Sequence, residues 1–155
     1  MSTQNSPAGA RYSRVLSYSE SRILLDAALA AAEEIGVPAS VAILDASREI
    51  VAFARQDFAP VLTGEVAIAK AFTSISLRQR SADLATAADA GGAFAGLHHA
   101  SQRSLATFGG GLPLFDGDNI IGAIGASGGS IEEDLTIATA ALAAFDALPA
   151  EGVVA

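Results

Sequence analysis

Residues 108–134 read FGGGLPLFDGDNIIGAIGASGGSIEED, and this stretch decides the fold. It holds more than half of the chain's 15 glycines. A glycine cluster indicates special backbone angles or close approach of two segments. The turn Asp116–Asn119 separates two runs of β-forming residues, which is the pattern of a β-hairpin. Gly122 and Gly125 lie inside the second strand, so we expect another backbone or a ligand to come close there.

A helix follows the hairpin. Ser130 and Glu133 have the spacing of a capping box, in which each side chain accepts a hydrogen bond from the other residue's backbone N–H. Pro149 marks the end, because proline does not continue a helix. Between these points apolar residues recur at helical spacing and predict one buried face, made of Leu135, Ala138, Leu142 and Phe145.

The chain before the hairpin contains further helices and strands. Ser17 and Glu20 repeat the capping-box spacing, and Gly36 and Pro38 end the helix that they begin. Two runs rich in β-branched residues then predict a second hairpin. Strands gathered in hairpins indicate an α+β fold with an antiparallel sheet. The upstream elements expected are a helix at 17–35, strands at 39–44 and 49–55, a helix at 63–77, a short segment at 81–88 and a helix at 94–105.

Several of these stretches resemble one known family. They are Gly110–Pro113, Ile121–Gly128 and Glu132–Asp134 around the hairpin, with Val41–Asp45, Arg55–Asp57 and Lys70–Ala71 upstream. On these motifs the chain resembles the GlcG/HbpS family, which includes the C-terminal domain of PduO-type proteins, from roughly Ser19 to Phe145. The resemblance implies a profilin-like fold, with an antiparallel sheet of about five strands flanked by helices. It also implies haem as a possible cofactor, because the family has haem-binding members.

Two positions depart from the family pattern. Gln56 replaces the methionine of the Arg-Met-Asp motif, and Phe58 stands where a glycine is usual. Both fall in the loop after the second strand, so we expect the shape of that loop to differ. The sequence itself shows four strands, and the family's fifth strand is expected near residues 91–93 or 107–110.

Composition limits the class of protein. A chain of 155 residues is long enough for one domain with its own core, expected at 17–148 between flexible tails at 1–16 and 149–155. The formal charge of −8 argues against nucleic acid or an anionic membrane as a partner. The absence of cysteine excludes disulfides and thiolate chemistry. With neither a secretory signal nor a membrane span in the sequence, we expect a cytoplasmic protein.

Charged residues near the glycine loop are the candidates for chemistry. Lys70 lies in an apolar stripe, where it either covers apolar surface with its stem or pairs with a carboxylate in a cleft. Glu132 and Asp134 either stabilise the start of the last helix or face a pocket as acid, base or cation partner. We predict Lys70 and Glu132 as catalytic residues and Asp134 as a ligand-binding residue.

Further ligand-binding residues are expected beside them. Arg55 and Asp57 follow the second strand, where they form either a surface ion pair or part of the site. Gly110 and Gly125 would let a ligand approach the backbone. The glycine loop matches neither the Rossmann nor the P-loop spacing, which disfavours nucleotide binding.

His98 and His99 are the only histidines in the chain. His98 shares the expected helix face with Phe94, Leu97 and Leu105, which predicts a half-buried imidazole that is either structural or an axial ligand of haem. Adjacent histidines point about 100° apart on a helix, so they do not both bind one metal. No zinc-ligand spacing is present, and we predict no metal site.

Three functions remain open on the sequence. The first is binding of haem or another small molecule in a cleft near the hairpin. The second is a cofactor-independent lyase, isomerase or hydratase for a small carbonyl, hydroxy-acid or aromatic compound, using Lys70, Arg55 and a carboxylate. The third is a structural or regulatory assembly. In each case we expect a homo-oligomer, because the helix at 63–77 is apolar on both sides.

Overall fold

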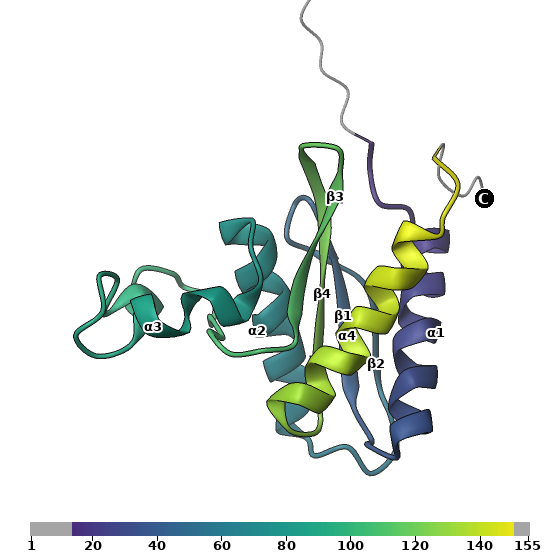
Figure 1. The fold of residues 1–155 in the computed structure, drawn as a ribbon, viewed down its shortest axis with the longest axis horizontal. Coiled ribbons are helices and arrows are strands. Elements are labelled where there is room, and N and C mark those ends of the chain that lie inside the picture. Colours follow the sequence, from purple (N-terminus) through teal and green to yellow (C-terminus); the bar gives the residue numbers. More distant parts are fainter. Residues whose placement is uncertain (1–13, 151–155) are drawn as a thin grey trace, which may run out of the picture.

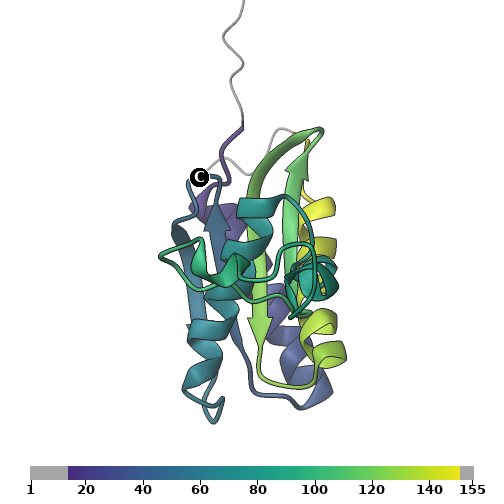
Figure 2. The same ribbon diagram turned by 90° about the vertical axis from the view of Figure 1, so that its left-hand side faces the viewer.

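A computed structural model describes residues 14–150, so most of the two expected tails lies outside the described residues. The described chain has a four-stranded antiparallel sheet of order β2-β1-β4-β3, with helices on both faces (Figures 1 and 2). The α+β class is therefore confirmed. The elements are α1 (Tyr18–Ile35), β1 (Ser40–Asp45), β2 (Ile50–Arg55), α2 (Leu62–Leu77), α3 (Ala85–Ala88), β3 (Gly111–Asp116), β4 (Asn119–Ser127) and α4 (Ile131–Asp146), with 3-10 turns η1 (Ser81–Leu84) and η2 (Leu97–His99).

Helices α1 and α4 cover one face of the sheet and α2 covers the other (Figure 1). Alternation along β1 assigns its side chains to the two layers, because successive residues of a strand point to opposite faces. Val41 and Ile43 pack with α1 and α4, whereas Ala42 and Leu44 pack with α2. Buried alanines and glycines keep both helix layers close to the sheet.

At Gly125 the backbone of α2 comes very close to β4. A Cβ atom at this position would lie 1.9 Å from the carbonyl oxygen of Ala67, a residue of α2. Real Cβ atoms do not come that close to a backbone oxygen, so the position requires glycine. The expected close approach at Gly125 is thus confirmed, and the group that approaches is the backbone of α2.

The local signals at the helix ends are confirmed. Both capping boxes form, between Ser17 and Glu20 at α1 and between Ser130 and Glu133 at α4. Gly36 ends α1 in the left-handed conformation, with φ of 71°. Each of these signals depends on residues that are neighbours in the sequence, which is why the sequence shows them.

The helix expected at 94–105 is wrong. In its place is an irregular segment, residues 85–104, which we call the arm; it extends away from the body beyond α2 (Figures 1 and 2). Its only helical pieces are α3 and the three-residue turn η2. Gly91 and Gly96 adopt φ of 88° and 89°, and left-handed residues interrupt a right-handed helix. The apolar spacing in this segment therefore belongs to no helix face.

The expectation of a fifth strand also needs correction. The described residues form four strands, with none at 91–93 or 107–110, so the family's fifth strand is absent there.

Within residues 14–150, no helix is long and apolar enough to cross a membrane. The same residues contain no cluster of three or more histidine, cysteine or acidic side chains suited to a metal ion.

Candidate functional site

Lys70 and Asp134 form an ion pair inside the protein. Lys70 is the chain's only lysine, and its side chain is 0% exposed. Its Nζ donates to Asp134 Oδ2 at 2.6 Å and to the carbonyl oxygen of Ala126 at 2.9 Å. The ring centre of Phe108 lies 4.9 Å from the same nitrogen. The expected pairing of Lys70 with a carboxylate is therefore present, and the partner is Asp134.

The other oxygen of Asp134 holds the glycine loop. Oδ1 accepts hydrogen bonds from the backbone N–H groups of Gly128 and Gly129, both at 2.9 Å. Asp134 thus serves as a partner for Lys70 and as an anchor for the loop that leads into α4. Each carboxylate oxygen has a donor, as a buried charge requires.

Gly110 makes room for the ion pair. It has φ of 114°, and a Cβ there would lie 2.9 Å from Lys70 Nζ and 2.6 Å from the carbonyl oxygen of Ala126. Only glycine combines that backbone angle with that space. The glycines at the start of the hairpin therefore admit the lysine side chain, and this accounts for Gly110 without a ligand.

Burial lowers the pKa of Lys70, and the hydrogen bond and charge of Asp134 oppose this effect. A lowered pKa is one requirement for a nucleophilic lysine. The other requirement is access for a substrate, but the side chain of Lys70 is 0% exposed and that of Asp134 only 5%. In this conformation the Lys70 ammonium is a buried structural group.

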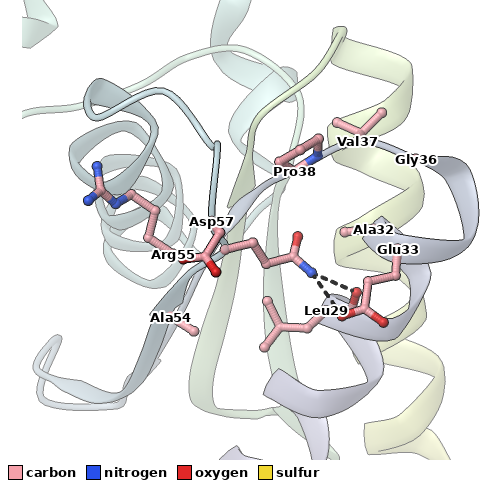
Figure 3. Close-up of a pocket in the computed structure, with 10 residues that line it drawn as sticks. Leu29, Ala32, Glu33, Gly36, Val37, Pro38, Ala54, Arg55 and Asp57 are labelled. Carbon is pink, nitrogen blue, oxygen red and sulfur yellow. Dashed lines mark hydrogen bonds between the residues drawn. The ribbon is translucent and has the colours of Figure 1, made fainter.

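Arg55 and Asp57 lie elsewhere, at a pocket between the end of α1 and the end of β2 (Figure 3). The pocket has a volume of about 580 Å³ and a mainly apolar wall. Figure 3 shows the Arg55 guanidinium pointing away from Glu33 on α1. The residues around the pocket are Leu29, Ala32, Glu33, Gly36, Val37, Pro38, Ala54, Arg55, Gln56 and Asp57.

Gln56 crosses this pocket and was not among the predicted site residues. Its Nε2 donates to the carbonyl oxygen of Leu29 at 3.2 Å and lies 3.5 Å from Glu33 Oε1. Its Oε1 accepts from the backbone N–H of Ala39 at 3.0 Å. The methionine usual here in the family has no amide to make these bonds. The departure from the family motif was the signal that marked this position.

The predicted site residues do not meet at one place. Glu132 is exposed on the first turn of α4, and Arg55 and Asp57 are exposed at the α1–β2 pocket, whereas Lys70 is enclosed. His98 is exposed on the arm rather than half-buried, because the helix that was to bury it does not form. Of the residues proposed to act together, Lys70 meets the carboxylate of Asp134, whereas Arg55 and Glu132 lie apart from this pair.

A second group that the sequence did not reveal lies where the arm rejoins the body. The guanidinium carbons of Arg103 and Arg48 lie 4.2 and 5.5 Å from the ring centre of Phe72. Arg103 Nη1 donates to the carbonyl oxygen of Arg48 at 2.8 Å. No local motif joins two residues this far apart, so only the fold brings them together.

Comparison with known proteins gives the family. The family model described as haem degrading protein HbpS-like matches residues 16–143, which is most of the chain. This chain belongs to the HbpS-like family. The resemblance noted from the hairpin and its flanking motifs is thereby confirmed.

Members of the family and their solved structures are similar along most of this chain. Corrinoid adenosyltransferase PduO of Citrobacter freundii is 36% identical over 131 residues, covering 84% of this chain but only 39% of that enzyme. The chain thus spans about two-fifths of the length of this relative. The crystal structure of Klebsiella pneumoniae protein ORFY has a TM-score of 0.87 at 29% identity, covering 91% of this chain and 97% of ORFY.

The crystal structure of a PduOC–haem complex is also similar. Its TM-score is 0.81 at 34% identity, and the match covers 84% of this chain and 95% of PduOC. The two imidazoles of this chain, at His98 and His99, are both exposed on the arm. Their donor atoms fit the group chemically, since neutral imidazole is a common axial ligand.

Proposed function

We propose that this protein binds haem, or another small molecule with an apolar body, where the arm leads into the glycine-rich hairpin. The observation that supports this most is the similarity to PduOC, whose structure was solved with haem. The arm places His98 and His99 in solvent, where an iron could reach them. Haem, when bound, would supply an iron centre whose properties depend on the axial ligand.

One imidazole of the arm is the proposed axial ligand. Because η2 is a short 3-10 turn, His98 and His99 leave it in different directions, and one iron takes only one of them. Lys70 has no place in this site, since its ammonium is enclosed.

The test is titration with hemin, followed by the Soret band. Wild type is expected to bind hemin with a histidine-ligated spectrum. Of the two variants His98→Ala and His99→Ala, one is expected to lose this spectrum and the other to keep it. The double variant is expected to lose ligation. A wild type that leaves the hemin spectrum unchanged contradicts haem binding. An unchanged ligated spectrum in the double variant contradicts histidine ligation.

A second candidate is the cofactor-independent lyase, isomerase or hydratase. The α1–β2 pocket favours it, because a cavity of about 580 Å³ with Arg55 and Asp57 at its edge suits a small carboxylic acid. A thermal-shift screen of small carbonyl and hydroxy acids against wild type and Arg55→Gln tests this site. Shifts that are equal in the two proteins, or absent in both, contradict it.

We also propose that the protein is a homo-oligomer. The connection from β2 into α2 presents Phe58, Val61 and Leu62 to solvent, with Phe58 96% exposed. Adjacent large apolar side chains on a surface mark contact with another chain. Sedimentation at micromolar concentration is expected to show a species larger than the 15.5 kDa protomer. A single species at the protomer mass contradicts the proposal.

A further inference from the structure

Arg48 and Arg103 come together over Phe72 from distant parts of the chain. Arg48 lies in the turn between β1 and β2, with φ of 69°, and Arg103 lies in the last part of the arm. Both guanidinium groups lie within 6 Å of the Phe72 ring centre, at 5.5 and 4.2 Å. Stacking on an aromatic ring holds a guanidinium in place and leaves its N–H edge free to bind.

These two positive charges have little compensation. Glu49 Oε1 lies 3.6 Å from Arg103 Nη1, and the Glu49 side chain is 76% exposed. Between residues 14 and 150, no carboxylate lies within 4.0 Å of the Arg48 guanidinium. In a chain with a formal charge of −8, two neighbouring guanidinium groups form a local site for an anion.

A pocket of about 330 Å³ is lined by Arg103 and by Phe72, the residue whose ring both guanidinium groups approach. Ile68, Ala69 and Phe72 of α2 form its apolar wall, and residues 102–104 of the arm form the opposite side. Glu65 is exposed at its edge and would repel a ligand that carries several negative charges. The surroundings therefore favour an apolar molecule with a carboxylate at one end over a polyphosphate.

We propose that Arg48 and Arg103 bind the carboxylate of the small-molecule ligand, whose apolar body lies against Ile68 and Phe72. The guanidinium group matches a carboxylate in planar, two-point hydrogen bonding. The inference rests on the proposed function: if the ligand is haem, the carboxylate is a propionate. The ligand would then be held at two places, by the arginines on the body of the protein and by an imidazole on the arm.

The two arginines differ in structural role. Arg103 also fastens the arm, through its bond to the Arg48 carbonyl oxygen, so its loss would disturb the fold locally. Within residues 14–150 the Arg48 side chain makes no hydrogen bond, so Arg48→Gln is the variant that disturbs the fold less. Arg22→Gln is the matched control, because Arg22 is exposed on α1 and its substitution removes the same single positive charge.

The experiment compares hemin with its dimethyl ester, which lacks free carboxylates, and with 2-naphthoate as a simple aromatic carboxylate. Wild type and Arg22→Gln are expected to bind hemin about tenfold tighter than the ester, the effect of losing a hydrogen-bonded charge. Arg48→Gln is expected to bind hemin as weakly as the ester. Equal binding of hemin and ester by wild type overturns the inference, as does unchanged hemin affinity in Arg48→Gln.

The outcomes separate this inference from haem binding itself. If hemin binding depends on histidine but hemin affinity is unchanged in Arg48→Gln, the proposed haem function is supported and the carboxylate site is overturned. Binding of 2-naphthoate that is lost in Arg48→Gln, with no binding of hemin, supports the carboxylate site and contradicts haem as the ligand. Failure of wild type to bind any of the three probes contradicts both.

Discussion

Lys70 Nζ lies 2.6 Å from Asp134 Oδ2, although the two residues are 64 positions apart and belong to helices on opposite faces of the sheet. The lysine side chain passes the end of β4, where Gly110 leaves space for it. One ion pair thus joins all three layers of the domain. It also fixes the loop at Gly128 and Gly129, through the other carboxylate oxygen.

Lys70→Met is expected to lower the free energy of unfolding by about 3 to 5 kcal/mol, because it removes the amine's hydrogen bonds to Asp134 and to the Ala126 carbonyl oxygen and leaves both buried acceptors unpaired. Urea denaturation measures the change. The double variant Lys70→Met/Asp134→Asn is expected to be less destabilised than Lys70→Met, since Asn keeps an acceptor for the loop N–H groups without the charge. A loss below about 1 kcal/mol in Lys70→Met would show that the pair contributes little.

The exposed pair of Arg22 and Asp26, with 3.9 Å between Nη2 and Oδ2, is the control. Arg22→Gln is expected to change the free energy of unfolding by no more than about 0.5 kcal/mol, because exposed pairs on helices contribute little. The contrast between the two variants isolates the effect of burial from the effect of losing one positive charge.

Because Lys70 is the only lysine, amine acylation reports directly on the opening of this site. In the folded protein, an amine-reactive ester is expected to label the chain's α-amino group and leave Lys70 unmodified. In denaturant both amines are expected to react. Peptide mass spectrometry distinguishes the two positions. Rapid labelling of Lys70 in the folded protein would show that the site opens, and would restore Lys70 as a candidate nucleophile.

The pKa of Lys70 predicts how stability depends on pH. Burial lowers this pKa from its ordinary value of 10.5 in the folded protein, so the unfolded chain holds the proton to higher pH. Between the two pKa values the unfolded state binds more protons, and the free energy of unfolding therefore rises with pH. We expect wild type to gain stability relative to Lys70→Met up to about pH 10.5. If wild type instead loses stability relative to Lys70→Met over this pH range, the effect of Asp134 outweighs burial and the pKa of Lys70 is raised.

Local signals predicted the parts of the fold that depend on neighbouring residues. The turn at Asp116–Asn119 and the two capping boxes were evident because their partners lie within four residues of one another. The arm was mispredicted because Phe94, Leu97 and Leu105 have helical spacing, while Gly96 takes a left-handed angle that spacing does not reveal.

The candidate sites depend on contacts between distant segments. Motif matching suggested Lys70 and Asp134 separately, and only the sheet shows that they meet inside the protein. Arg48 and Arg103 are 55 residues apart and belong to no motif, so nothing in the sequence paired them. The role of Lys70 depends on its burial, which the sequence does not give. Its position in an apolar stripe indicates that other groups lie near it, but not whether solvent or a ligand reaches it.

Phe58 provides a test of the loop that departs from the family. It stands where the family usually has glycine, its φ is 70°, and its side chain is 96% exposed. A left-handed angle costs a residue with a Cβ about 1 to 2 kcal/mol. Phe58→Gly removes this strain and no buried contact, but gives the unfolded chain more freedom. We expect the free energy of unfolding to rise by up to about 1 kcal/mol.

Gly36 is the matched control, with φ of 71° and no atom within 4 Å of the place where a Cβ would be. Gly36→Ala adds the same strain without a clash and is expected to lower the free energy of unfolding by about 1 kcal/mol. Denaturation at a concentration where the protein is monomeric measures both variants. If Phe58→Gly is destabilising while Gly36→Ala behaves as expected, the side chain of Phe58 contributes more than the strain costs. Sedimentation of Phe58→Gly at higher concentration then shows whether that contribution comes from contact with a second copy.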